Sequence, residues 1–214
     1  MQSLWLFLSQ LGDSRLLLPL SLVLILFGTQ GDSALRVRWT IGLAIAGGLS
    51  LVSKLAFLGW GIGWAHLDFT GFSGHATMTA AIYPVALYLT LRGRVRLPLA
   101  GAVAGALLSA AISYSRLPLN AHSVSEVVSG WLLGMAVSSI ALRGRSNGFV
   151  TPFPTIAGAI LVGTMTIMML STVRTHDLVL RLATGLSGRT EVFTRPVNCT
   201  QSAPRTKPHC GHRR

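Results

Sequence analysis

Long apolar runs separated by short polar segments dominate the sequence. Each run is close to the roughly 17–25 residues that an α-helix needs to cross the hydrocarbon core of a bilayer. The pattern predicts an all-α fold, an integral membrane bundle of six transmembrane helices. The predicted spans are residues 16–30, 39–58, 75–91, 97–114, 123–142 and 155–173. Gly and Ala are frequent in the stretch 99–111, which favours close approach of neighbouring helices.

Composition supports a membrane protein and argues against a nucleic-acid partner. Hydrophobic residues make up 50% of the chain and charged residues 11%, against about 25% charged in soluble domains. Mean hydropathy is +0.57. The net charge is +12, but ten of the 18 Lys and Arg residues fall in residues 1–173, mostly in short loops beside apolar runs. We therefore expect membrane lipids, and no nucleic acid, around this chain.

The arginines in the loops predict an orientation. They follow the first, third and fifth spans, so they share one face, which the positive-inside rule makes cytoplasmic. The opposite face carries the loops 59–74 and 115–122 and both termini. We expect a protein of the bacterial cytoplasmic (inner) membrane with this second face toward the periplasm. The arginines are Arg36, Arg38, Arg92, Arg94, Arg96, Arg143 and Arg145.

The two ends of the chain differ from its centre. The first residues lack a basic region, so we expect no signal peptide, and Leu4, Trp5, Phe7 and Leu8 are typical of an interfacial segment. We expect one six-span domain over residues 1–173 and a basic tail over 174–214. The tail begins with an apolar stripe typical of a surface helix, formed by Leu178, Val179, Leu182 and Leu186, and continues as a disordered segment. Cys199 and Cys210 either pair or stay free, and with the histidines of "HCGH" at 209–212 they are a weak metal-binding pattern.

Five ionisable residues stand near the predicted extracytoplasmic ends of the spans. Lys54 lies near the end of the second span, His75 and His122 open the third and fifth, Arg116 follows the fourth, and Glu126 is one turn into the fifth. Ionisable side chains at membrane depth are costly, and each is a functional hypothesis. Their position on one face of the membrane predicts a common site.

These residue types fit a phosphate site with two histidines. His122 and Glu126 are four apart, so the carboxylate can hold one ring nitrogen protonated and leave the other as a nucleophile or base. Lys54 and Arg116 supply positive charge for phosphate oxygens. The residue pair before His75 lies at a helix N-terminus, where backbone N–H groups attract an anion. That pair is Ser73 and Gly74.

Each residue also has a simpler interpretation. Lys54 can snorkel to the interface, Arg116 can bind lipid headgroups, and Ser73 can cap a helix. A histidine that opens a helix can be an interfacial residue, and a carboxylate four residues after it can be an ordinary helix pair. The outer loop adds possible headgroup ligands and an aromatic belt: His66, Asp68, Trp60, Trp64, Phe69 and Phe72.

Two motifs resemble the type 2 phosphatidic acid phosphatase superfamily. The stretch "SGH" at 73–75 resembles the Pro-Ser-Gly-His motif of that family, with Phe72 in place of Pro. The stretch "SRLPLNAHSVSE" at 115–126 resembles its Ser-Arg, five residues, His, three residues, Asp motif, with Glu126 in place of Asp. Its first motif, Lys, six residues, Arg-Pro, is matched by Lys54 alone, because Gly61 and Ile62 hold the last two places.

The resemblance implies a metal-independent and cofactor-free lipid phosphatase. It implies a phosphate monoester or diphosphate of a membrane lipid as substrate, with phosphatidate, phosphatidylglycerophosphate, an isoprenyl diphosphate and a lipid A-like glycolipid as candidates. By position, His122 would be the nucleophile that forms a phosphohistidine, Glu126 would orient it, and His75 would be the general acid. The phosphoryl group would be bound by Lys54, Ser73, the Gly74 amide and Arg116. Neither the resemblance nor the composition predicts an oligomeric state.

Two alternatives remain from the sequence. The absence of an arginine at Gly61 favours a catalytically degenerate phosphatase fold used for lipid binding or transport. The string "GFSG" at 71–74, with His122 49 residues after Ser73, also fits a rhomboid-type intramembrane serine protease. A protease needs a Ser–His pair, and it has no use for Lys54, Arg116 and Glu126 together.

Overall fold

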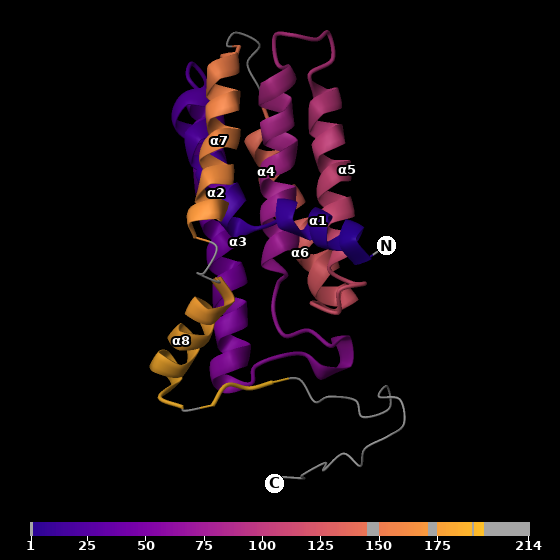
Figure 1. Ribbon diagram of the computed structural model, residues 1–214, viewed down its shortest axis with the longest axis vertical. Coiled ribbons are helices and arrows are strands. Elements are labelled where there is room, and N and C mark those ends of the chain that lie inside the picture. The colour runs from indigo at the N-terminus through magenta and orange to yellow at the C-terminus, as the bar shows by residue number, and fades with distance from the viewer. Residues whose placement is uncertain (1, 145–149, 171–174, 190, 195–214) are drawn as a thin grey trace.

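The computed structural model describes residues 2–144, 150–170, 175–189 and 191–194. These residues fold into helices and contain no β-strand, which confirms the all-α prediction (Figure 1). In chain order the elements are α1 (Gln2–Leu11), α2 (Ser14–Val23), a π-helical turn (Leu24–Gly28), α3 (Ser33–Trp60), a 3-10 turn (Ala65–Leu67), α4 (Gly74–Leu91), α5 (Leu99–Ser115), α6 (Val124–Ala141), α7 (Phe153–Met169) and α8 (Thr175–Ser187).

Three segments of the described chain are long and apolar enough to cross a membrane. They are Gln2–Gly28, Ser33–Trp60 and Val124–Ala141, and Leu99–Tyr114 and Phe153–Met169 are shorter apolar helices. Together they indicate membrane association, while the count of six spans stays a prediction. The boundaries differ most at the start of the chain. The apolar segment expected over 16–30 is α2 followed by the π-helical turn, and α3 begins at Ser33 instead of residue 39.

Helices α1 and α2 meet at a sharp corner. Helix α1 ends at Leu11, and Asp13 caps α2, because its side chain accepts a hydrogen bond of 2.8 Å from the backbone N–H of Arg15. Figure 1 shows α1 lying across the bundle while α2 runs along it. The predicted interfacial segment is therefore a separate helix, packed crosswise against the bundle.

Helix α4 forms the centre of the bundle and contacts its neighbours through backbone atoms. A Cβ atom at Gly105 of α5 would lie 2.4 Å from the carbonyl oxygen of Tyr83. A Cβ atom at Gly134 of α6 would lie 2.2 Å from the carbonyl oxygen of Thr77. Only glycine permits these approaches, as expected for small residues at helix contacts in membranes.

The outer surface of the bundle is apolar. Large hydrophobic side chains are exposed along the outward faces of the long helices, which is the reverse of the surface of a soluble domain. This distribution fits contact with lipid chains. Examples are Val37, Ile41, Ile45 and Val52 on α3, Val103 and Leu107 on α5, Leu132 on α6, and Leu161 and Met168 on α7.

The arginine-rich loops gather at one end of the bundle. A buried ion pair of 3.3 Å joins Arg92, after α4, to Asp32, before α3. Arg94 donates a hydrogen bond of 2.6 Å to the carbonyl of Thr151, just before α7. The start of α3, the end of α4 and the start of α7 thus lie together. The end of α3 and the start of α4 lie at the opposite end of the bundle.

Helix α8 packs on the last turns of α3. A Cβ atom at Gly59 would lie 3.3 Å from Cβ of Ser187, and Ala183 is buried in this contact. The leucines of the predicted apolar stripe remain exposed at Leu178, Leu182 and Leu186. Cys199, Cys210 and the "HCGH" segment lie outside the described residues, so the hypotheses about them stay predictions.

Candidate active site

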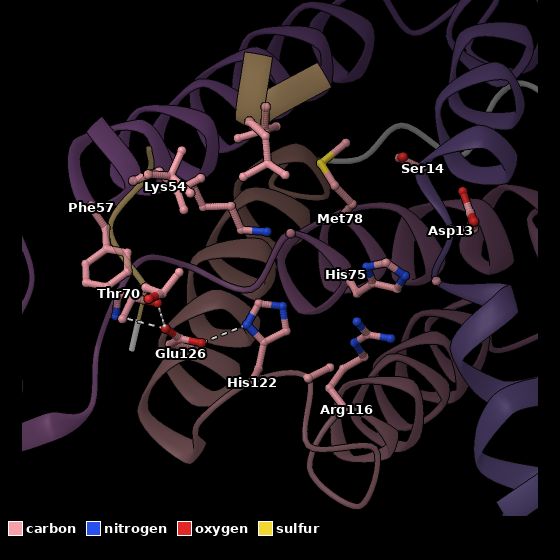
Figure 2. Close-up of a pocket in the computed structure, with 18 of the residues that line it drawn as sticks. Asp13, Ser14, Lys54, Phe57, Thr70, His75, Met78, Arg116, His122 and Glu126 are labelled. Carbon is pink, nitrogen blue, oxygen red and sulfur yellow. Dashed lines mark hydrogen bonds and ion pairs between the residues drawn. The ribbon is translucent and has the colours of Figure 1, made fainter. Parts of the chain in front are cut away.

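One cavity of about 810 Å³ opens where α3 ends and α4 begins. Six of the seven predicted site residues line it, from three helices and the loop between α5 and α6 (Figure 2). They are Lys54, Gly74, His75, Arg116, His122 and Glu126. In Figure 2 the nitrogen atoms of Lys54, His75, Arg116 and His122 surround a common space. Residues separated by up to 72 positions in the sequence are thus brought together.

His122 and Glu126 form a hydrogen-bonded pair at the start of α6. Nδ1 of His122 lies 2.7 Å from Oε2 of Glu126. The spacing of four suggested two residues on one face of a helix, but His122 precedes α6 and Ser123 is the N-cap of that helix. Ser123 and Glu126 form a capping box, in which the Ser123 hydroxyl and the Glu126 carboxylate each accept a backbone N–H bond of 3.4 Å. This cap fixes the carboxylate beside the imidazole.

The Glu126 carboxylate is almost completely buried and bound on both oxygens. Its side chain is 1% exposed, and its Oε1 atom accepts a bond of 2.8 Å from the backbone N–H of Thr70 and a second bond from the Thr70 hydroxyl. These donors favour the ionised carboxylate. The carboxylate then holds the proton on Nδ1 of His122 and leaves a lone pair on the other ring nitrogen. Sequence reasoning missed Thr70, because no local pattern connects it to residue 126.

Burial lowers the pKa of His122 below its ordinary value of 6.5. Removal of the imidazole from water disfavours its charged form, and the hydrogen bond to Glu126 opposes this effect without cancelling it. His122 is therefore neutral at neutral pH. A neutral imidazole with its Nδ1 proton held by a carboxylate is suited to nucleophilic attack.

Lys54 and Arg116 give the cavity positive charge. Neither forms an ion pair with any residue that the structure describes. Arg116 donates a hydrogen bond from Nη1 to the hydroxyl of Ser9 on α1, a contact that the sequence did not predict. Its Nε atom is buried and has no hydrogen-bond partner in the described part of the chain. Two cations without carboxylate partners are suited to an anion.

The start of α4 leaves room for a ligand. A Cβ atom added at Gly74 would meet nothing within 4 Å. His75 follows, and its ring lies 2.9 Å from the position of a Cβ atom at Gly12, in the corner between α1 and α2. Ser73 is the predicted site residue that does not line the cavity, and it is fully buried. Its hydroxyl has no hydrogen-bond partner among the described residues.

The loop before α4 folds back over α3 and positions Thr70. Gly71 has φ of +141°, and a Cβ atom there would lie 3.1 Å from the backbone nitrogen of Lys54. Both features require glycine. The backbone N–H of Phe72 donates a bond of 3.1 Å to the Ser53 hydroxyl, which holds the loop on α3. His66 of this loop is exposed and does not line the cavity.

The C-terminal segment covers the position where the family motif has an arginine. Gly61 ends α3 with φ of +71°, and its Cβ position lies 3.1 Å from the ring of Phe193. The backbone N–H of Phe193 donates a bond of 2.9 Å to the carbonyl of Leu58. Val192, Phe193 and Thr194 form a C-terminal wall of the cavity. The sequence did not predict this wall. It also did not predict the corner between α1 and α2, although Asp13-Ser14 is a helix-start signature. The additional lining residues from these two segments are Gly12, Asp13, Ser14, Arg15, Val179, Leu180, Val192, Phe193 and Thr194.

The described residues contain no cluster of metal-ligating side chains. No group of three or more His, Cys, Asp or Glu side chains that could hold a metal ion occurs there. The cavity contains a paired imidazole, a second imidazole, and the two cations Lys54 and Arg116. Side chains of these types can act as a nucleophile, a proton donor and a binding site for an anion.

Comparison with known proteins agrees with these features. Residues 53–149 match the PAP2 superfamily. The chain is 36% identical over 202 residues to an uncharacterised 22.5 kDa protein in the cps region of Klebsiella pneumoniae, covering 89% of this chain and 95% of that protein. No solved structure matches the chain. The matched segment contains every predicted site residue, from Lys54 to Glu126. The chain therefore belongs to the PAP2 superfamily.

Proposed function

We propose that the protein is a membrane-bound phosphatase that hydrolyses a lipid phosphate or diphosphate monoester through a phosphohistidine at His122. Members of the PAP2 superfamily are generally phosphatases, which supports a phosphoric ester hydrolase. One observation carries the finer proposal: the His122–Glu126 pair lines the same cavity as His75, Lys54 and Arg116. Each group that the reaction requires is present in that cavity.

The first step transfers the phosphoryl group to the protein. The free ring nitrogen of His122 attacks phosphorus, and the bond between phosphorus and the oxygen of the lipid breaks. His75, in its protonated form, gives its proton to that oxygen, so the lipid leaves as an alcohol or, from a diphosphate, as a monophosphate. Glu126 stabilises the positive charge that develops on His122.

The second step returns the protein to its starting state. A water molecule attacks phosphorus, and neutral His75 accepts one of its protons. The bond between phosphorus and His122 breaks, and inorganic phosphate is released. Two steps with a covalent intermediate replace one difficult displacement. No metal or other cofactor takes part in this proposal.

The phosphoryl oxygens are bound by positive charge and by the start of α4. Lys54 and Arg116 face the space beside His122. The backbone N–H of Gly74 lies at a helix N-terminus, where the helix dipole favours an anion. The Ser73 hydroxyl does not line the cavity and is fully buried, so we assign it no contact with the phosphate. Such charge stabilisation supplies most of the catalysis in phosphoryl transfer.

The position of the cavity supports a lipid substrate. The cavity lies at the end of the bundle opposite the arginine-rich loops. Because the positive-inside rule places those loops in the cytoplasm, the end with the cavity is extracytoplasmic. In a bacterial inner membrane it would face the periplasm. Apolar side chains form part of its wall, from Phe57 and Leu58 on α3, Met78 on α4, and Val179 and Leu180 on α8. This combination of cations and apolar side chains matches a phosphate carried by a hydrocarbon chain.

The geometry does not support the protease alternative. The Ser73 hydroxyl is fully buried, and His122 is paired with Glu126 instead of with the serine. A serine nucleophile would require an exposed hydroxyl bonded to its general base. The degenerate, non-catalytic alternative depends on Gly61, and only an activity measurement distinguishes it.

The decisive experiment measures phosphate release by the purified protein in detergent with EDTA present. The panel contains phosphatidate, phosphatidylglycerophosphate, an isoprenyl diphosphate and a lipid A-like glycolipid. We expect release from at least one lipid, and its loss in His122→Ala, while His66→Ala retains it because that residue does not line the cavity. If folded protein releases phosphate from no lipid, the non-catalytic alternative is correct.

A further inference from the structure

Arg116 is connected to the N-terminal helix by a hydrogen bond between residues 107 positions apart. Its Nη1 atom donates to the hydroxyl of Ser9, which is buried on α1. Ser9 lies outside residues 53–149, the segment that matches the PAP2 superfamily. The partner of this arginine therefore comes from a part of the chain that the family motifs do not include.

Helix α1 is fixed relative to the rest of the site by contacts on both sides of Ser9. The ring of Trp5 packs edge-on against Tyr114 of α5, with centroids 5.7 Å apart. The hydroxyl of Tyr83 on α4 donates a bond of 2.8 Å to the carbonyl of Leu11. Ser9 thus presents its oxygen from a helix that is anchored to both α4 and α5.

The contact leaves Arg116 able to bind an anion. A guanidinium group has five N–H donors in a planar fork, and the bond to Ser9 uses one of them. Nε is buried without a described partner, and the side chain lines the cavity. A free arginine loses conformational freedom when it binds a ligand, and a side chain that is already held loses less.

We propose that Ser9 is a positioning residue that holds the Arg116 guanidinium at the cavity, ready for the phosphate group of the substrate. This inference rests on the proposed function, because it assigns phosphate binding to Arg116. It makes α1 a component of the active site. Ser9 itself touches Arg116 and not the substrate.

The test measures binding of inorganic phosphate by calorimetry to the full-length protein in detergent. We expect Ser9→Ala to weaken phosphate binding about 3- to 10-fold, the range for one side chain that must be immobilised on binding. Ser9→Thr keeps a hydroxyl and should bind as the wild type does. Ser3→Ala is the matched control, because Ser3 lies exposed on the same helix.

A double-mutant cycle on kcat/KM separates positioning from general stability. In an Arg116→Ala background, Ser9→Ala should cause no further loss, because its effect is exerted through the missing side chain. Additive losses of kcat/KM in the double mutant would overturn this inference alone. So would phosphate binding that is unchanged in Ser9→Ala but lost in Arg116→Ala. A wild-type protein that binds no phosphate, or an Arg116→Ala variant that binds it normally, would overturn the proposed function as well.

Discussion

The ring of Phe193 lies 3.1 Å from the position that a Cβ atom would occupy at Gly61. The residue that replaces the motif arginine is thus a left-handed helix cap, with φ of +71°, against which the C-terminal segment packs. Gly61 and the ring of Phe193 thus occupy the place that a motif arginine would need. An arginine at this position would displace Phe193.

Gly61→Arg should therefore destabilise the protein and add no activity. The left-handed backbone costs a non-glycine residue about 1–2 kcal/mol, and displacement of the Phe193 ring adds to that cost. We expect a lower apparent melting temperature in detergent and unchanged or lower turnover. Gly185→Ala on α8 is the control, because a Cβ atom there meets nothing within 4 Å. A more active Gly61→Arg protein with wild-type stability would show that the position is open to an arginine.

Glu126→Gln should reduce turnover by about 10²- to 10⁴-fold, because an amide neither fixes the imidazole tautomer nor stabilises its positive charge. The protein should still bind inorganic phosphate, since Lys54 and Arg116 remain. The measurement is kcat beside phosphate affinity. Equal losses in both quantities would mean that Glu126 acts on the whole site and not on His122.

The pH dependence of kcat/KM follows from the lowered pKa of His122. A protonated imidazole is no nucleophile, so activity should fall as pH decreases through this pKa, with the acid limb below 6.5. The hydrogen bond that His122 donates to the Glu126 carboxylate raises the pKa of His122. Its removal in Glu126→Gln should therefore move the acid limb of the residual activity to lower pH. An acid limb above 6.5 in the wild type would assign it to another group.

Gly74→Ala tests whether the open space at the start of α4 is the phosphate site. The added methyl group meets no protein atom within 4 Å, so the fold should be as stable as the wild type or slightly more stable. We expect turnover to fall by about 10²-fold, because the methyl group displaces the phosphate from its position. Gly158→Ala on α7, which is equally unhindered, should leave turnover unchanged. Wild-type turnover in Gly74→Ala would place the phosphate elsewhere.

Phe193→Ala tests the role of the C-terminal wall in substrate choice. A buried phenylalanine contributes roughly 1.5–3 kcal/mol when it covers hydrocarbon, so KM for a long-chain lipid phosphate should rise about 10-fold or more. KM for a water-soluble aryl phosphate should not change, because that ester has no long chain to cover. Leu186→Ala, on the exposed stripe of α8, is the control. Equal increases for both esters would make the wall a structural element only.

Local spacing made much of the candidate site predictable. The spacing of four positions from His122 to Glu126 fixes their distance almost independently of the rest of the fold, since both belong to one helix start. Hydropathy located α3, α4 and α6 to within a few residues, apart from the earlier start of α3. The glycine-rich stretch 99–111 correctly predicted a close helix contact, because the lack of a side chain at glycine lets two helix backbones approach each other.

Contacts between residues far apart in the chain could not be predicted from the sequence. Ser9 meets Arg116, and Thr70 meets Glu126, only because separate helices place them side by side. Phe193 belongs to a segment whose composition is typical of a tail, and it gains its place by packing on Gly61. Each of these contacts depends on tertiary packing, on which residue types and local periodicity carry no information.

Helix α3 continues for six residues beyond Lys54 before it ends at Trp60. At 1.5 Å per residue this extension rises roughly 9 Å past the lysine, and α8 packs against it. In the proposed function a phosphate near Lys54 would therefore sit in a recess below a rim of protein. A lipid anchored by its chains would reach such a recess by diffusion in the plane of the membrane, whereas a soluble ester would have to enter it from the water. The two products would then separate by solubility, with phosphate released to the water and the dephosphorylated lipid released to the bilayer. The reverse reaction would require both products to bind in the recess at the same time.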